Sequence, residues 1–189
     1  MQTNYLFQSN RLGFRNWKIG DHEPFADLNN DPEVMAFLPK GLCVEESSEM
    51  ISRMENTHND LGFTFFAVDL LETNEFIGFI GIIRSSFDAF FTPCYEISWR
   101  LKRSVWNKGL ASEGAIACLK YGFEVLQMDN IHSITSVLNK KIGIHNEKNW
   151  YVAPPSLNLF DGLSKKAFIS GARSPEIYSL LEKSKNIES

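Results

Sequence analysis

The sequence is poor in cysteine and contains no long apolar run. Only three cysteines occur among 189 residues, Cys43, Cys94 and Cys118, and they lie far apart in the chain. This spacing fits free thiols in a reducing compartment better than a disulfide framework or a zinc site, so we expect free cysteines that are buried. No apolar run approaches the roughly 20 residues that a membrane-spanning helix needs, so we expect no association with a membrane.

Basic residues are also in short supply. The chain has 19 Lys and Arg against 23 Asp and Glu, for a net charge of -4, so it has no broad basic surface for direct binding of nucleic acid. The start, Met1 to Tyr5, lacks the pattern of a signal peptide, so we expect a cytoplasmic protein. The four histidines lack metal-ligand spacing, and we interpret them as surface or turn residues and expect no bound metal; they are His22, His58, His132 and His145.

Apolar residues are plentiful enough for one folded domain. The chain is 43% hydrophobic and contains 15 Phe, which favours a substantial core over disorder. In the first half, alternation and helical spacing predict several elements. They are a strand over Arg11–Arg15, a helix capped by Asp21, a helical turn from Asp31, a helix over Glu45–Asp60, and a hairpin of Phe63–Leu70 with Phe76–Ile83.

The middle of the chain predicts a strand, a helix and another strand. Apolar Tyr95, Ile97, Trp99 and Leu101 alternate with Cys94, Glu96, Ser98 and Arg100, which is typical of a half-buried strand with one polar face. Ala111–Leu126 has small residues on one helical face, which permits close packing on a sheet. Ile131–Val137 is a further strand. This order of strands and helices predicts an α+β domain.

One segment between that strand and that helix has the features of a phosphate-binding loop. It reads Trp106-Asn107-Lys108-Gly109-Leu110-Ala111-Ser112-Glu113. Consecutive backbone N–H groups at a strand-to-helix junction can surround a phosphate, and the helix N-terminus adds partial positive charge. A tight turn with no ligand is the alternative, because a single Gly-containing turn is weak evidence.

The segment resembles the pyrophosphate loop of the GNAT superfamily of N-acetyltransferases. That loop reads Gln or Arg, two residues, Gly, one residue, then Gly or Ala. The branch that acetylates the N-termini of ribosomal proteins commonly reads Trp-Gly-x-Gly-Tyr-Ala-Thr-Glu-Ala, and this chain departs from it at Asn107, a residue type that tolerates left-handed geometry. Further segments resemble the same branch in the right order, so that the resemblance covers residues 9 to 141; they are Arg11–Arg15, Leu28–Met35, Phe76–Gly81, Tyr95–Leu101 and Asn139.

The resemblance implies a mixed, mostly antiparallel central sheet flanked by helices, with acetyl-CoA as cosubstrate and no metal. The backbone of Trp99, Arg100 and Leu101 would contact the pantetheine arm. The remaining implied cofactor-binding residues are Trp106, Asn107, Lys108, Gly109, Leu110, Ala111, Ser112 and Asn139. Glu96, on the polar face of its strand, would deprotonate the ammonium of the acceptor directly or through water. The alternative for Glu96 is a solvated carboxylate, or one paired with Arg84.

The implied reaction moves an acetyl group from acetyl-CoA to an amine. A protein N-terminus, a polyamine, an antibiotic and an amino acid all remain open as acceptors, and both a monomer and a homodimer remain open as assemblies. A catalytically impaired protein that binds CoA, or an interaction protein with the same fold, is the alternative function.

The character of the chain changes after residue 141, so we predict an acetyltransferase domain over 1–141 and an irregular tail over 142–189. The family continues with a helix of the type Ser-x-x-x-Met-x-Lys-Ile-Gly-Met, which is missing here. With one choice of codons for residues 139–152, removing one A from the A-run would restore Asn-Lys-Lys-Ser-Ala-Phe-Ile-Met-Lys-Lys-Ile-Gly-Met. We therefore interpret the tail as a shifted reading frame. We expect it to pack poorly and to leave the Ile131–Val137 strand without a neighbour.

Overall fold

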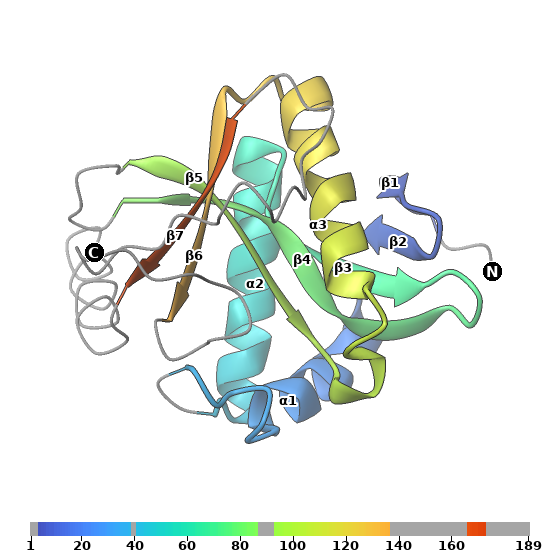
Figure 1. The fold of residues 1–189 in the computed structure, drawn as a ribbon. Coiled ribbons are helices and arrows are strands. Elements are labelled where there is room, and N and C mark those ends of the chain that lie inside the picture. Colours follow the sequence, from blue (N-terminus) through green and yellow to red (C-terminus); the bar gives the residue numbers. More distant parts are fainter. Residues whose placement is uncertain (1–3, 39–40, 87–92, 137–165, 173–189) are drawn as a thin grey trace.

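The protein is described from a computed structural model that covers residues 4–38, 41–86, 93–136 and 166–172. Its centre is one seven-stranded sheet in which the strands follow the order of the chain (Figure 1). The strands are β1 Phe7–Gln8, β2 Leu12–Arg15, β3 Phe65–Leu70, β4 Glu75–Ser85, β5 Cys94–Leu101, β6 Asn130–Ser136 and β7 Lys166–Ala172. Neighbours are antiparallel from β1 to β5, whereas β5–β6 and β6–β7 are parallel. The prediction of a mixed, mostly antiparallel α+β sheet is confirmed.

Helices cover both faces of the sheet. The helices α1 His22–Asn30 and α2 Val44–Leu61 bury Phe25, Ile51 and Met54 against β3 and β4, as shown by a cluster that includes Phe65 and Phe79. The third helix, α3 Leu110–Lys120, packs on the opposite face in a second and larger cluster. The sheet is thus enclosed between two apolar layers, and its polar side chains are confined to a few positions.

Close contact between α3 and the sheet depends on a glycine. A Cβ atom at Gly114 would lie 2.2 Å from Ile80 Cδ1 and 3.0 Å from Leu12 Cδ1. The small residues that predicted close packing on this helical face therefore do permit it. The predicted helix over Ala111–Leu126 was wrong at its end, because α3 stops at Lys120 and a π-helical turn follows over Tyr121–Val125.

The prediction that Asp21 is the N-cap of the first helix is confirmed by its position. Asp21 occupies the N-cap position of α1, but its side chain makes no capping hydrogen bond. Its carboxylate instead forms an ion pair with Arg15 at 2.6 Å, and Arg15 also pairs with Asp69 at 2.7 Å. All three side chains are buried, so the charges of this cluster stabilise one another where water cannot.

The strand β7 corrects the expectation for the tail. It pairs with β6 along its whole length, from Asn130↔Lys166 to Ser136↔Ala172. The prediction that the Ile131–Val137 strand, observed as β6, would lack a neighbour is therefore wrong. Residues 137–165 and 173–189 lie outside the described residues, and the origin of the tail stays a prediction.

Candidate active site

The strands β5 and β6 form a fork. They pair over only three positions, Tyr95↔Ile131, Glu96↔His132 and Ile97↔Ser133. Beyond Ile97, β5 continues to Leu101 in register with β4 alone among the described residues, and Figure 1 shows the two strands running apart after they cross. Backbone N–H and C=O groups on the β6 side of Ser98–Leu101 therefore line the opening of the fork, where an extended ligand can add to the strand edge.

Glu96 lies at the base of this fork on the side of the sheet that α1 and α2 cover. Its register partner on β4, Ile83, packs in the cluster of those helices. Burial raises the pKa of Glu96 to about 7, against the opposing effect of a 2.5 Å hydrogen bond donated by the Ser85 hydroxyl. Arg84 is opposite Tyr95, the residue before Glu96, and so points to the other face. The alternative of a Glu96–Arg84 pair therefore does not fit the register.

A carboxyl group with a pKa near 7 can exchange protons under neutral conditions. Cys94, two residues earlier on the same face, is a weaker candidate for chemistry. Burial, and then the charge of Glu96, raises the pKa of its thiol to about 11, so the thiolate needed for nucleophilic attack is scarce at pH 7. Of the three thiols that we expected to be buried, Cys118 is buried, Cys94 is half-buried and Cys43 is exposed.

The predicted phosphate loop has the expected backbone. Asn107 has φ 59° and Gly109 has φ 75°, so both adopt left-handed geometry, and Gly109 is the N-cap of α3. The first N–H groups of a helix have no acceptor within it. After buried Leu110, they belong to half-buried Ala111 and exposed Ser112, near exposed Lys108. The loop offers donors and partial positive charge to an anion.

Several predicted site residues also hold the structure around the fork. The Trp106 indole donates a hydrogen bond to the Leu101 carbonyl at 2.8 Å, which ties the loop to the end of β5. The Arg100 side chain lies over the Phe79 ring, 5.4 Å from its centroid, and donates to the Asn29 side chain on α1. Leu110 is buried in the core below the loop. Asn139 lies outside the described residues.

Glu113 is a residue that the motif contains but to which we assigned no role. Its carboxylate accepts hydrogen bonds from the Ser9 hydroxyl at 2.6 Å and from the backbone and side chain of Arg11 at 2.8 and 2.7 Å. Arg11 in turn donates to the Lys108 carbonyl at 3.1 Å. We call these hydrogen bonds the Glu113 clasp. They join the first turn of α3 to the β1–β2 hairpin and restrain the loop at Lys108. The sequence feature that could have indicated these contacts is an acidic residue in the first turn of the helix.

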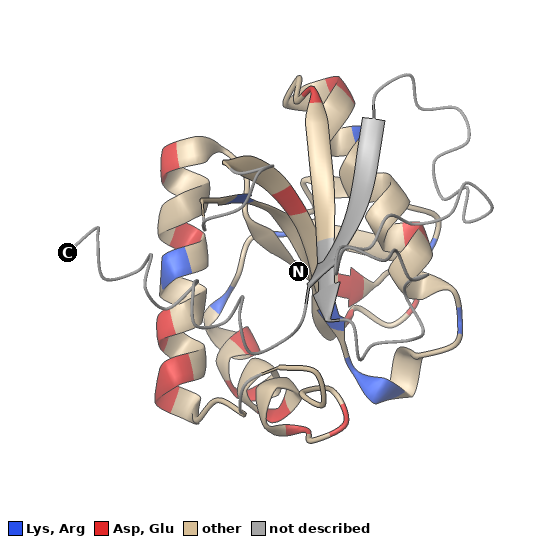
Figure 2. Ribbon diagram, turned by 60° about the vertical axis from the view of Figure 1, so that its left-hand side comes forward, with Lys and Arg blue, Asp and Glu red and all other residues tan. Residues whose placement is uncertain are grey.

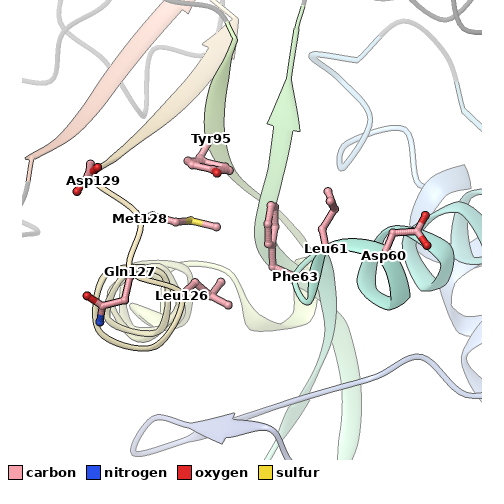
Figure 3. A pocket seen from close by; sticks show the side chains of 8 residues that line it. All are labelled: Asp60, Leu61, Phe63, Tyr95, Leu126, Gln127, Met128 and Asp129. Atoms are coloured by element: carbon pink, nitrogen blue, oxygen red, sulfur yellow. The ribbon is translucent and has the colours of Figure 1, made fainter.

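A separate pocket of about 460 Å³ lies near the start of β5 and β6 (Figure 3). Its lining includes Tyr95, which points away from the face that carries Glu96. The complete lining is Asp60, Leu61, Phe63, Tyr95, Leu126, Gln127, Met128 and Asp129. Within the described ranges, no helix is long and apolar enough to span a membrane, and no group of three or more acidic, histidine or cysteine side chains is arranged to hold a metal.

The three described histidines are partly exposed, which is consistent with their interpretation as surface residues. His22 and His58 lie in helices, where His22 Nδ1 is 2.9 Å from the Ser48 hydroxyl and the His58 ring meets the Phe66 ring edge-on. His132 is half-buried in β6, directly opposite Glu96. His145 lies outside the described residues. The position of His132 opposite Glu96 cannot be predicted from the sequence of one strand, because the register depends on the partner strand.

Comparison with known proteins places the chain in a family. A family model described as acetyltransferase (GNAT) domain matches residues 11–143. YnaD, described as an uncharacterized N-acetyltransferase of Bacillus subtilis strain 168, is 29% identical over 144 residues, which cover 72% of this chain and 81% of that protein. The crystal structure of a GNAT-family acetyltransferase from Bacillus anthracis aligns with a TM-score of 0.59 and 27% identity over 71% of this chain and 75% of that one.

A third similar protein was crystallised with ligands. The spermidine N-acetyltransferase from Vibrio cholerae, in complex with CoA and spermine, aligns with a TM-score of 0.56 over 69% of this chain and 75% of that one. At 22% identity this likeness shows the fold. The family model covers more than half of the chain. The chain therefore belongs to the GNAT acetyltransferase family, and this membership supports acetyl transfer to an amine as its general activity.

Proposed function

We propose that this protein is an N-acetyltransferase that uses acetyl-CoA and employs Glu96 as its general base. The observation that carries the proposal is the position of Glu96 at the base of the β5–β6 fork, with a pKa raised to about 7 by burial. The left-handed loop at Asn107 and Gly109 supplies anion-binding N–H groups at the start of α3. A phosphate-binding loop and a buried base at the two ends of one strand fit the cosubstrate and the reaction.

The fork fits the extended shape of the cosubstrate. The pyrophosphate would lie on the loop from Trp106 to Ser112, and the pantetheine arm would run along the free edge of β5 past Trp99, Arg100 and Leu101. The thioester would then face Glu96. The amine attacks the thioester carbonyl, backbone N–H groups at the strand edge stabilise the oxyanion, and CoA thiolate leaves. Holding both reactants beside each other supplies much of the rate.

The charge of the surrounding helices favours a cationic acceptor. The helices α1 and α2 together carry seven carboxylates and a single arginine, and Figure 2 shows acidic residues along them. They cover the same face of the sheet as Glu96. The negative electrostatic potential of these carboxylates raises the local concentration of positively charged amines. Within this class we propose a polyamine or a protein N-terminus as acceptor, the latter in keeping with the ribosomal-protein branch that the loop motif resembles.

The test has two stages. Calorimetric titration should show binding of acetyl-CoA, and Gly109→Val should abolish it, because a β-branched side chain would crowd the phosphate and cannot adopt this backbone easily. Gly62→Val is the matched control, since Gly62 has φ 78° at the end of α2 with open space around its Cβ position. Both variants place Val at a left-handed backbone position. A loss of acetyl-CoA binding in Gly109→Val but not in Gly62→Val therefore identifies the loop as the binding site.

The second stage measures thiol release with a panel of amines that includes spermidine and peptides with free N-termini. Turnover with cationic amines should fall as ionic strength rises, since salt screens the acidic helices. If the protein binds no acyl-CoA, the proposed function is wrong. If it binds acetyl-CoA but acetylates no amine, it is the impaired CoA-binding protein instead.

A further inference from the structure

His132 is placed to exchange protons with the base. In the parallel β5–β6 ladder it is the direct partner of Glu96. Directly opposite residues point to the same face, and neighbouring strands lie about 4.8 Å apart. The two side chains therefore leave the sheet side by side. This pair is one position from the last paired rung, Ile97↔Ser133, after which the strands separate.

The described neighbours of Glu96 on β4 and on its own strand are poorer carriers of a proton than His132. On the β4 side, Glu96 meets the Ser85 hydroxyl and apolar Ile83. Along its own strand it has Cys94, whose thiol holds its proton at neutral pH. Burial lowers the pKa of His132 below that of an ordinary histidine, so its imidazole is neutral at pH 7 and can accept a proton on one nitrogen. His132 is only half-buried, so its ring also reaches solvent.

The proposed reaction requires such a carrier. An acceptor ammonium has three protons on nitrogen and the amide product keeps one, so two protons must leave in each turnover. One of them converts the leaving CoA thiolate into CoA thiol, and the other goes to solution. A single carboxylate holds one proton at a time. Glu96 must therefore release the proton of the ammonium before it can accept the second one from the tetrahedral intermediate.

We propose, on the basis of the proposed function, that His132 relays this first proton from the Glu96 carboxylic acid to water. The ammonium gives its proton to the Glu96 carboxylate, and the free amine forms the C–N bond. The Glu96 acid passes the proton to the neutral imidazole, and the imidazolium releases it to solvent. Glu96 then takes the proton from the nitrogen of the intermediate while the C–S bond breaks, and this proton neutralises the thiolate. His132 acts through Glu96 and contacts neither substrate.

The test uses the full chain and two substitutions. His132→Ala should lower kcat at pH 7 at least about tenfold, which is less than the roughly 10² to 10⁴ that a group acting directly on the substrate contributes, with little change in the affinity for acetyl-CoA. Added imidazole at constant pH should restore much of that loss, because a small base can occupy the space of the missing ring. His132→Gln preserves polarity and packing but carries no proton, so it should also lose turnover. His22→Asn is the matched control and should lose none.

A double-mutant cycle separates a relay from a structural role. In the Glu96→Gln background a relay has no proton to carry, so His132→Gln should add no further loss. Full turnover in both His132 variants, losses that imidazole does not restore, or losses that add to those of Glu96→Gln would overturn the relay. If the unmodified protein acetylates no amine, the proposed function fails instead, so the two failures are distinguishable.

Discussion

Replacing Glu96 by Gln should make the protein more stable and less active. An ordinary Glu has a pKa of 4.5, and burial raises that of Glu96 to about 7. The folded state thus binds the proton more tightly than the unfolded state. The carboxylate consequently costs stability as pH rises from 4.5 to 7, and the full cost is present at pH 8. At about 1.36 kcal/mol for each pKa unit, this cost is on the order of 3 kcal/mol.

Gln at position 96 keeps the size of the side chain and can still bond to the Ser85 hydroxyl. We therefore expect Glu96→Gln to match the unmodified protein in free energy of unfolding at pH 4.5 and to exceed it by about 1 to 3 kcal/mol at pH 8. Urea unfolding at both pH values measures this difference. Glu124→Gln, at an exposed position of the π-helical turn, is the control and should show no difference between the two pH values.

The same substitution should change the dependence of turnover on pH. In the unmodified protein kcat/KM should fall about tenfold for each pH unit below 7, as the Glu96 carboxylate becomes protonated. The Gln variant can use only amine that is already free, which for a primary amine with a pKa near 10 is about a thousandth of the total at pH 7. Its loss should be about 10² to 10⁴ at pH 7 and shrink toward pH 10. Equal rates across this range, or an advantage in stability that does not vary with pH, would refute the assignment.

Three further predictions concern the support of the site and the tail. Ser85→Ala removes the hydrogen bond that stabilises the Glu96 carboxylate, so the midpoint of the pH–rate profile should move to higher pH; an unmoved midpoint would count against this bond. Arg15→Ala leaves Asp21 and Asp69 buried without their cation and should cost about 3 to 5 kcal/mol in denaturant unfolding. A gene version with one A removed within the codons for Asn139–Lys141 should encode a protein with higher Tm and higher turnover, and equal values for the two versions would reject the shifted reading frame.

The local elements of the fold could be predicted from the sequence because each depends on nearby residues. Alternation places β5 at Cys94–Leu101 as expected, and helical spacing places α2 within one residue of its predicted ends. The two-residue strand β1 was missed, since two residues are too few to show a period. The end of α3 was misplaced because the change to a π-helical turn over Tyr121–Val125 interrupts no apolar pattern.

The candidate site was predictable only where one continuous segment forms it. The loop at Asn107 and Gly109 is such a segment, and its left-handed geometry follows from the residue types. The Ser85 hydroxyl that bonds to Glu96 and the His132 position opposite Glu96 belong to two other strands, and their register is fixed by the packing of the whole sheet. The clasp of Glu113 with Arg11 likewise joins residues about a hundred positions apart.

The shape of the fork depends on a contact that lies outside it. Gly122, in the π-helical turn, sits directly against the sheet, where an added Cβ would lie 2.7 Å from both Ile131 Cδ1 and Ile82 Cδ1. Ile131 belongs to the first of the three rungs that join β6 to β5, and Ile82 belongs to β4. The turn thus packs against β4 and β6, the two strands on either side of the start of β5. It packs on the face of the sheet opposite Glu96. Because His132 follows Ile131 directly, the close packing of this glycine on Ile131 supports the part of β6 that carries the proposed partner of the base.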